Sequence, residues 1–256
     1  MSFLSLVGIE FKKIKRSKIM LILFVAIVFL WLPSIFNAKM NFNMQDIGIS
    51  PENNFLIQGF LGMTGFMFPA SMVVGTVLLT QTERGNRGIL KMLSLPISTP
   101  KLCMAKFTII LSLAATQILM NVGMYFISAA IVSQTQSYNF MLSPLFVFKE
   151  AALMFLFSIP MIAIFWMLSV CIQTPIFAIG VGLASIVPSV LMINTKIWFV
   201  YPMCYPFYAI AAEYGKLATN MSTNGINFSL LLPIAIAITV ICSTVSCIRF
   251  GQAERR

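Results

Sequence analysis

The chain has 256 residues, of which 59% are hydrophobic and only 9% are charged. Soluble domains carry about 25% charged residues, so this composition excludes an ordinary water-soluble globule and predicts an integral membrane protein. The apolar runs are continuous and about 20 residues long, which favours spanning helices over the shorter, alternating strands of a β-barrel. The net charge of +10 could suggest a nucleic-acid partner, but its placement along the chain indicates a membrane orientation signal instead.

Residues 1–18 are predicted to form a basic amphipathic helix. Phe3, Val7, Phe11 and Ile14 recur at helical spacing, while most of the neighbouring lysines fall on the other side. We expect this helix to lie along a membrane face before the first span. The alternative is a charged flank that only orients that span, and both descriptions can hold together.

Six apolar spans follow. They are predicted at residues 19–36, 55–80, 107–132, 150–172, 175–193 and 228–247. The nearly uncharged run from Glu150 to Ile193 would otherwise form one helix far longer than the ~30 Å hydrocarbon core. Gln173-Thr174-Pro175 is its natural break, because proline has no N–H to donate to a continuing helix.

A polar segment, residues 81–106, joins the second and third spans. It contains five positively charged residues: Arg84, Arg87, Lys91, Lys101 and Lys106. A short amphipathic helix is predicted from Gly88 to Leu95, where Pro96 ends it. A short helix between spans cannot bury its apolar side in its own fold, so it needs a partner surface or the membrane interface. A simple solvated loop is the alternative.

Residues 37–54, 133–149 and 194–227 are predicted to lie on the opposite side of the membrane. The last of these is unusually aromatic, with seven aromatic residues between Trp198 and Tyr214. It is too short in apolar length to cross, so we expect a re-entrant or interfacial hairpin.

The charges define an orientation for this arrangement. With six spans, both termini and residues 81–106 share one side, which holds thirteen of the seventeen Lys and Arg residues. The positive-inside rule places that side in the cytoplasm, so we expect a multi-pass membrane protein with both termini on the cytoplasmic side. The expected fold is therefore an all-α membrane domain covering residues 1–256.

The chemistry available in the sequence is limited. There is no histidine, and the five cysteines have no CxxC spacing, so neither a metal site nor a bound cofactor is expected. The sequence has no G-x-x-x-x-G-K-[ST] phosphate-binding loop and no paired carboxylates for catalysis. No charged residue lies deep in a predicted span, which disfavours an ion-coupled carrier. We expect a non-enzymatic membrane subunit whose energy comes from another chain.

The polar segment supports this expectation by resemblance. Glu83, then Leu93-Ser94-Leu95-Pro96-Ile97-Ser98, then Lys101 and Ala105-Lys106, resembles the first cytoplasmic loop of six-span ABC exporter permeases of the second class. In that family this loop forms a coupling helix that docks on the ATP-binding subunit. The resemblance implies an ATPase partner that binds ATP and Mg²⁺. It also implies coupling roles for residues across the segment: Glu83, Arg87, Leu90, Leu93, Leu95 and Pro96.

The short length and the basic start Glu10-Phe11-Lys12-Lys13-Ile14-Lys15-Arg16-Ser17-Lys18 look most like bacterial permeases of lantibiotic self-immunity and antimicrobial-peptide resistance. These commonly pair two different permeases with two copies of one ATPase. The resemblance implies a location in the bacterial plasma membrane and a peptide antibiotic as substrate. From its composition, we expect the external aromatic segment to meet that peptide, through Trp198, Tyr201, Tyr205, Tyr208 and Glu213. Interfacial anchoring in membrane lipid is the alternative for the aromatic residues. Export of another amphipathic molecule (a drug, a lipid or a bacteriocin) and a non-transporting sensor or structural subunit are the alternative functions.

Overall fold

The computed structural model describes the chain apart from residues 1–2, 16–18, 85–97, 219–227 and 253–256. Its long helices are α1 (Phe3–Lys15), α2 (Ile19–Phe36), α3 (Pro51–Gly62), α4 (Phe68–Arg84), α6 (Thr99–Gln136), α7 (Pro144–Cys171), α8 (Pro175–Met192), α9 (Tyr205–Leu217) and α10 (Phe228–Gln252). Short helical turns lie between some of them: η1 (Ala38–Ile47), η2 (Met63–Met67), η4 (Trp198–Val200) and η5 (Pro202–Cys204). The described chain is all-α, as the sequence predicts.

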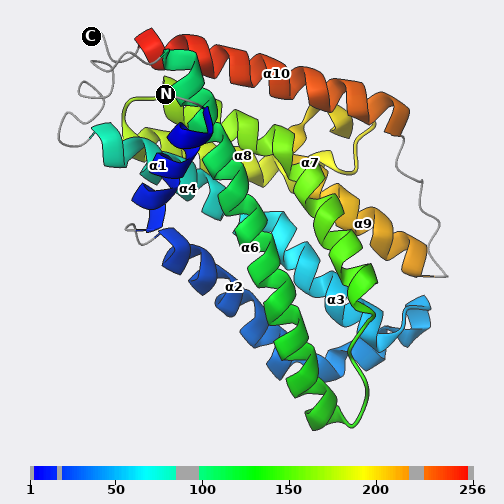
Figure 1. Cartoon of the computed structure of the whole chain (residues 1–256). Helices are drawn as coiled ribbons and strands as arrows, with labels where there is room; N and C mark the ends of the chain where they lie inside the picture. The colour runs from blue at the N-terminus through cyan, green and yellow to red at the C-terminus, as the bar shows by residue number, and fades with distance from the viewer. Residues whose placement is uncertain (1–2, 16–18, 85–97, 219–227, 253–256) are drawn as a thin grey trace.

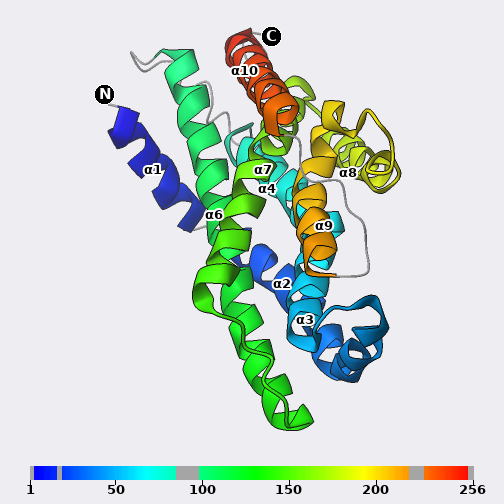
Figure 2. The same cartoon turned by 90° about the vertical axis from the view of Figure 1, so that its right-hand side faces the viewer.

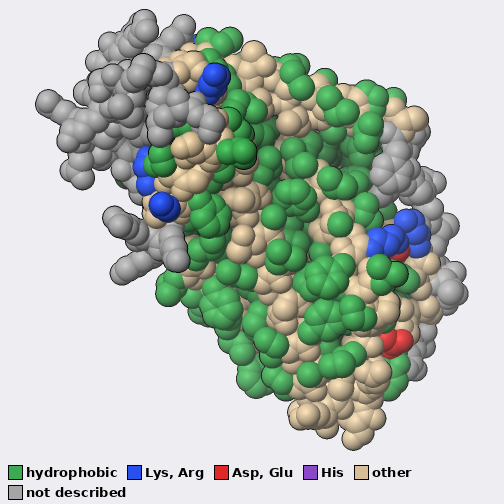
Figure 3. All heavy atoms as spheres, in the orientation of Figure 1, with side chains coloured by type: hydrophobic (Ala, Val, Ile, Leu, Met, Phe, Trp, Pro, Cys, Tyr) green, Lys and Arg blue, Asp and Glu red, His purple; other side chains and the backbone are tan. Residues whose placement is uncertain are grey.

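Six helical stretches of the described chain are long and apolar enough to cross a membrane, which confirms the predicted number. They are α2, the continuous run from α3 to α4, and then α6, α7, α8 and α10. Large apolar side chains cover their outer surfaces; Phe29 of α2 is 67% exposed and Ile176 of α8 is 85% exposed. Figure 3 shows a wide apolar band with the coloured charges gathered toward its two ends. Such a continuous apolar surface fits lipid rather than water.

The two ends of the molecule carry different elements. Helix α1, the end of α4, the start of α6 and the end of α10 lie together at one end, which we call the basic end (Figure 1). Cys247 Sγ near the end of α10 lies 3.9 Å from the Pro100 carbonyl oxygen at the start of α6. The opposite end, where α6 finishes and α7 begins, is called the far end (Figures 1 and 2).

Three spans extend beyond the apolar runs from which we predicted them. We expected the polar segment to continue to Lys106, but α6 already begins at Thr99, so the last part of that segment forms the opening turns of α6. Likewise α7 begins at Pro144 and α3 at Pro51, earlier than the hydropathy indicated. The reason is the same in each case: a serine is followed within two residues by proline. Proline suits the first helical turn because a backbone N–H at that position would have no partner within the helix, so its absence costs nothing.

The second span contains a turn of π-helix. In η2 the hydrogen bonds reach five residues back, so this turn holds one residue more than an α-helix would. Glycines stand where other helices approach it. A Cβ on Gly62 would lie 2.8 Å from Leu30 of α2, and one on Gly65 would lie 3.4 Å from Phe207 of α9. Small residues of this kind let helices pack closely inside a membrane.

Polar side chains fix two spans to α6 inside the apolar core. Trp31 Nε1 of α2 donates a 2.9 Å hydrogen bond to Asn121 Oδ1, and both side chains are buried. Ser71 Oγ of α4 lies 2.8 Å from Gln117 Oε1, one turn earlier on the same face of α6. Interhelical hydrogen bonds in membranes contribute about 0.6–2 kcal/mol each, so these contacts fix the register of α2 and α4 against α6.

One face of α8 packs against α4 through small residues. Ala178, Gly182, Ile186 and Ser189 form its buried stripe, at the spacing of one helical face. A Cβ added to Gly182 would lie 2.6 Å from Val73 Cγ1 and 2.9 Å from Val73 Cγ2. Since valine is β-branched and stiff at χ1, it cannot swing aside easily.

We therefore predict that Gly182→Ala separates α8 from α4 and destabilises the protein by about 1–3 kcal/mol. Gly180→Ala is the matched control, since it lies on the exposed side of α8 and a Cβ added there would have no described atom within 4 Å. Thermal unfolding of the purified variants in mild detergent measures the difference. Equal unfolding temperatures for the two variants would contradict the close α4–α8 contact.

Candidate functional site

The predicted coupling residues lie at or beyond the end of α4. Glu83 lies in the last turn of that helix, at the basic end. Arg87, Leu90, Leu93, Leu95 and Pro96 all lie outside the described residues. The described chain stops at Arg84 and resumes at Ser98, and the end of α4 and the start of α6 both lie at the basic end (Figure 1).

Helix α1 packs on the opening turns of α6. Its buried face carries Leu6, Glu10 and Ile14, each four residues from the next. Phe3 and Phe11, which we expected on the apolar face, are exposed on the outside of the helix. The helix thus has two apolar sides, one against the protein and one available to lipid, with a carboxylate in the middle of the protein side.

That carboxylate belongs to a buried ion pair. Lys106 Nζ of α6 lies 3.1 Å from Glu10 Oε2, and Lys13 Nζ lies 2.7 Å from Glu10 Oε1. Lys106 is 0% exposed. Burial raises the pKa of Glu10, but the positive charges of Lys106 and Lys13 outweigh it, so the pKa of this carboxyl lies below its ordinary value. The pair joins α1 to the opening turns of α6.

The aromatic segment forms η4, η5 and α9. Helix α9 packs against both α3 and α7 and leads toward the far end (Figures 1 and 2). Trp198 of η4 stacks on Tyr208 of α9 with ring centroids 3.7 Å apart and an interplanar angle of 21°. Both rings are half-buried, so this stacked pair keeps part of its surface open.

The other two tyrosine candidates hold the segment together. Tyr205 is only 1% exposed, and its hydroxyl donates to the Phe199 carbonyl oxygen. The Tyr201 hydroxyl donates to the Ser185 carbonyl oxygen of α8. Their hydroxyls therefore have partners within the protein, so these two residues shape the segment more than they face a ligand outside it.

Glu213, the acidic candidate of the aromatic segment, is shielded from the surface. It is buried, with Lys216 Nζ 2.8 Å from Oε2 and Lys149 Nζ of α7 3.8 Å from Oε1. Lys149 also lies 3.4 Å from Oε1 of Glu150, which is fully buried in α7. The surface of this cluster is formed by its lysines, since the side chain of Lys149 is 57% exposed and that of Lys216 is 54% exposed. An arriving ligand meets ammonium groups there before it meets a carboxylate.

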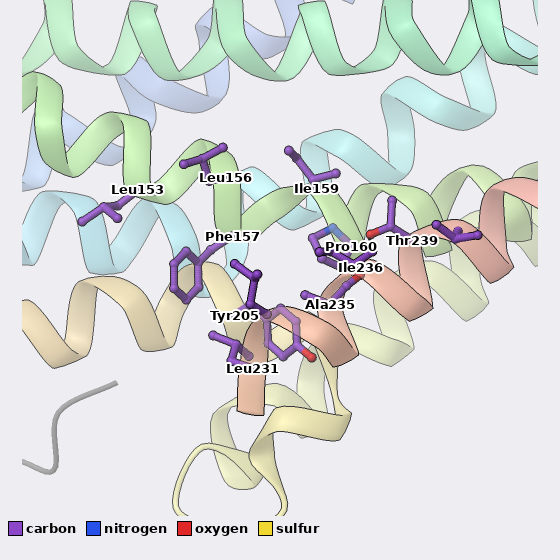
Figure 4. Close-up of a pocket in the computed structure, with 12 residues that line it drawn as sticks. Leu153, Leu156, Phe157, Ile159, Pro160, Tyr205, Leu231, Ala235, Ile236 and Thr239 are labelled. Carbon is purple, nitrogen blue, oxygen red and sulfur yellow. Dashed lines mark hydrogen bonds between the residues drawn. The ribbon is translucent and has the colours of Figure 1, made fainter. Parts of the chain in front are cut away.

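An apolar groove of about 360 Å³ lies between α7 and α10. Figure 4 shows α7 side chains on one side and α10 side chains on the other, with Tyr205 of α9 beside Leu231. Its lining is Leu153, Leu156, Phe157, Ile159, Pro160, Tyr205, Leu231, Leu232, Ala235, Ile236, Thr239 and Val240. Several of these are well exposed on the apolar surface, so the groove opens sideways toward lipid. Trp198 packs against the cluster formed by Phe157, Tyr205 and Leu231.

Comparison with known families identifies the type of protein. The model of the family described as ABC-2 family transporter protein matches residues 6–189, which run from α1 into α8 and include the polar segment 81–106. The chain belongs to this ABC-2 family. No curated protein and no solved structure matches it.

Membership of the ABC-2 family has direct consequences. The chain is a multi-pass membrane permease subunit of an ABC transporter, and its family implies an ABC ATPase as partner. Permeases of this family are transmembrane subunits that typically carry no ATPase site of their own. Among the described residues, no group of three or more His, Cys, Asp or Glu side chains is placed to hold a metal ion.

Sequence reasoning missed two features of this ABC-2 permease. The Glu10–Lys106 pair joins residues 96 positions apart, and no local pattern marks either as buried. The groove combines α7 with α10, and its lining residues read in sequence as ordinary lipid-facing positions. The sequence did contain a pattern that could have placed Lys106 in a helix. Ser98-Thr99-Pro100 is typical of a helix start, and Lys106 follows it closely enough to belong to that helix and not to a loop.

Proposed function

We propose that this ABC-2 permease removes lantibiotic-type antimicrobial peptides from the bacterial plasma membrane, as part of an immunity or resistance transporter. Two copies of an ATPase would bind ATP and Mg²⁺ and serve this chain and a second, related permease. The short chain and its basic start support this narrower assignment by resemblance. The observation that carries it is the half-buried Trp198–Tyr208 stack, which keeps part of its aromatic surface open.

The basic end faces the cytoplasm in this proposal, because the positive-inside rule applies to the thirteen cations predicted on that side. Closure of the ATPase dimer moves residues 85–97, which connect α4 directly to α6. The Glu10–Lys106 pair makes α1 follow the start of α6, so the interfacial helix tilts together with the third span. The motion thereby reaches the membrane surface as well as the spans.

Peptides of this class are amphipathic and cationic and collect at the outer membrane surface. Aromatic rings are well suited to that boundary, since each offers an apolar body at low conformational cost. The exposed part of the Trp198–Tyr208 stack gives such a peptide a flat apolar contact. Glu213 contributes little attraction in this picture, because Lys216 and Lys149 already pair with it.

We predict that Trp198→Ala combined with Tyr208→Ala lowers protection against a panel of lantibiotics by about tenfold, the effect of losing about 1.4 kcal/mol of ring contact. Growth inhibition is measured in cells that express the complete transporter. The double variant should still assemble and hydrolyse ATP. Phe36→Ala is the matched control, since this aromatic is 81% exposed at the end of α2 and lies outside the segment.

Protection equal to wild type at equal expression would reject the aromatic stack as a peptide contact. Loss of protection in both the double variant and Phe36→Ala would instead indicate general interfacial anchoring. A fall in protection against unrelated amphipathic drugs, with lantibiotic protection unchanged, would favour a different export substrate.

A further inference from the structure

Two exposed lysines continue the faces of the helices that build the groove. On α7, Lys149 precedes Leu153, Leu156 and Pro160 by four, seven and eleven residues. Those intervals return to the same side of an α-helix, so Lys149 lies on the groove's own stripe, with its Cα about 6 Å nearer the far end than that of Leu153.

Helix α9 repeats this arrangement in the opposite chain direction. Tyr205 lines the groove, and Lys216 follows it by eleven residues, on the same side of α9. Both ammonium groups contact one carboxylate: Lys149 Nζ lies 3.8 Å from Glu213 Oε1, and Lys216 Nζ lies 2.8 Å from Glu213 Oε2. The two cations are therefore held close together, where the two groove-forming stripes meet the far end.

We propose that this region binds an anionic phospholipid, with one acyl chain in the α7–α10 groove and the phosphate between Lys149 and Lys216. An ammonium group has three N–H donors, and the contacts to Glu213 and Glu150 leave donors on both lysines for phosphate oxygens. More than half of each lysine side chain is exposed, so a headgroup can reach them without displacing the buried carboxylates.

The groove itself fits an acyl chain. Its only lining hydroxyls belong to Tyr205 and Thr239, and these already donate to the carbonyl oxygens of Phe199 and Ala235. No polar lining atom therefore requires a polar ligand, and apolar burial is what the groove offers. A cationic amphiphile fits less well, because the exposed charges at this end of the groove are positive. The proposal does not depend on the identity of the transported substrate.

The test uses the complete transporter in lipid nanodiscs that contain phosphatidylglycerol and phosphatidylcholine in equal amounts, without any peptide. After transfer to mild detergent, mass spectrometry measures the phospholipid that stays bound. We expect phosphatidylglycerol to exceed phosphatidylcholine by about tenfold in the wild type, from two lysines that are partly neutralised by their carboxylates. Lys149→Gln combined with Lys216→Gln should remove that excess. Lys39→Gln combined with Lys196→Gln removes the same charge at two other exposed lysines and should leave it unchanged.

A groove-filling variant separates the lipid from other occupants. Ala235→Trp should reduce the retention of both lipids while both chains of the permease pair still co-purify. Equal retention of the two lipids by the wild type, or an unchanged excess in the Lys149/Lys216 variant, would overturn the proposal. Loss of the second permease in Ala235→Trp with lipid retention unchanged would also overturn it, since the groove would then be a helix–helix interface.

Discussion

Replacing Lys106 with methionine is expected to destabilise the protein by about 3 kcal/mol. Methionine keeps much of the length of the side chain but leaves the buried Glu10 carboxylate without its α6 partner. Lys13 still contacts the other carboxylate oxygen, which places the expected loss at the lower end for a broken buried pair. Thermal unfolding in mild detergent should show a fall of roughly 6–12 °C.

Two further variants make this result specific. Lys101→Met removes an exposed lysine from the opening turns of the same helix and should change the unfolding temperature little. Glu10→Gln combined with Lys106→Met should recover much of the loss, because no unpaired buried charge remains. If Lys106→Met costs no more than Lys101→Met, the buried pair does not hold α1 to α6.

The pair also predicts a direction for pH dependence. The pKa of Glu10 is lowered in the folded protein, so its contribution to stability is complete above the ordinary glutamate pKa of 4.5. That contribution is lost as the pH falls through the lower folded value and the carboxylate is protonated. Unfolding temperatures measured across this acid range should converge for wild type and Glu10→Gln, and should differ most near neutral pH.

Adding a carboxylate to the predicted short helix of the polar segment, residues 88–95, should have the largest effect on function. Leu90→Asp or Leu93→Asp is expected to abolish co-purification of the ATPase, or its coupling to transport, while membrane insertion stays normal. Burying an unpaired carboxylate costs several kcal/mol, enough to undock a short helix from a partner groove. The end of α4 and the start of α6, which flank this segment, lie at the basic end, and that end faces the cytoplasmic ATPase in the proposed orientation.

Asn86→Asp provides the matched control, because it adds the same charge just before the predicted short helix. It should leave ATPase binding intact. Pull-down of the ATPase from detergent extracts and transport-coupled ATP hydrolysis measure the two outcomes. Normal values for both leucine variants would indicate that residues 88–95 are only a solvated connection.

The six spans could be predicted because hydropathy is a local property. A run of about 20 apolar residues has few alternatives to a spanning helix, whatever lies around it. The ends of the spans were harder to predict, because a helix can continue through polar residues when another element covers them. Lys106 is the clearest case: it looks like part of a charged loop, but Glu10 of α1 allows it to be buried inside α6.

The aromatic segment shows the limit of composition in another way. Its many aromatic residues indicated a membrane–water interface, but composition could not predict which rings remain exposed on the protein surface. The Tyr205 hydroxyl is satisfied by a carbonyl six residues earlier, so this residue is buried, whereas Trp198 and Tyr208 stack and remain half-buried. The groove could not be predicted from the sequence, because it forms between α7 and α10 and no pattern within either helix indicates which helix lies beside it.

The π-turn η2 lets the second span hold one more residue without changing which sides of its two halves face their partners. Each residue of an α-helix turns the chain by about 100°. The wider turn of Met63–Met67 takes up its extra residue, so α4 keeps nearly the phase of a regular helix that lacks that residue. If the same number of residues formed regular α-helix throughout, Ser71 would turn away from Gln117, and Val73 away from Gly182. The irregular turn thus preserves the helical phase of one continuous span, in which α3 contacts α2 and α9, and α4 contacts α6 and α8.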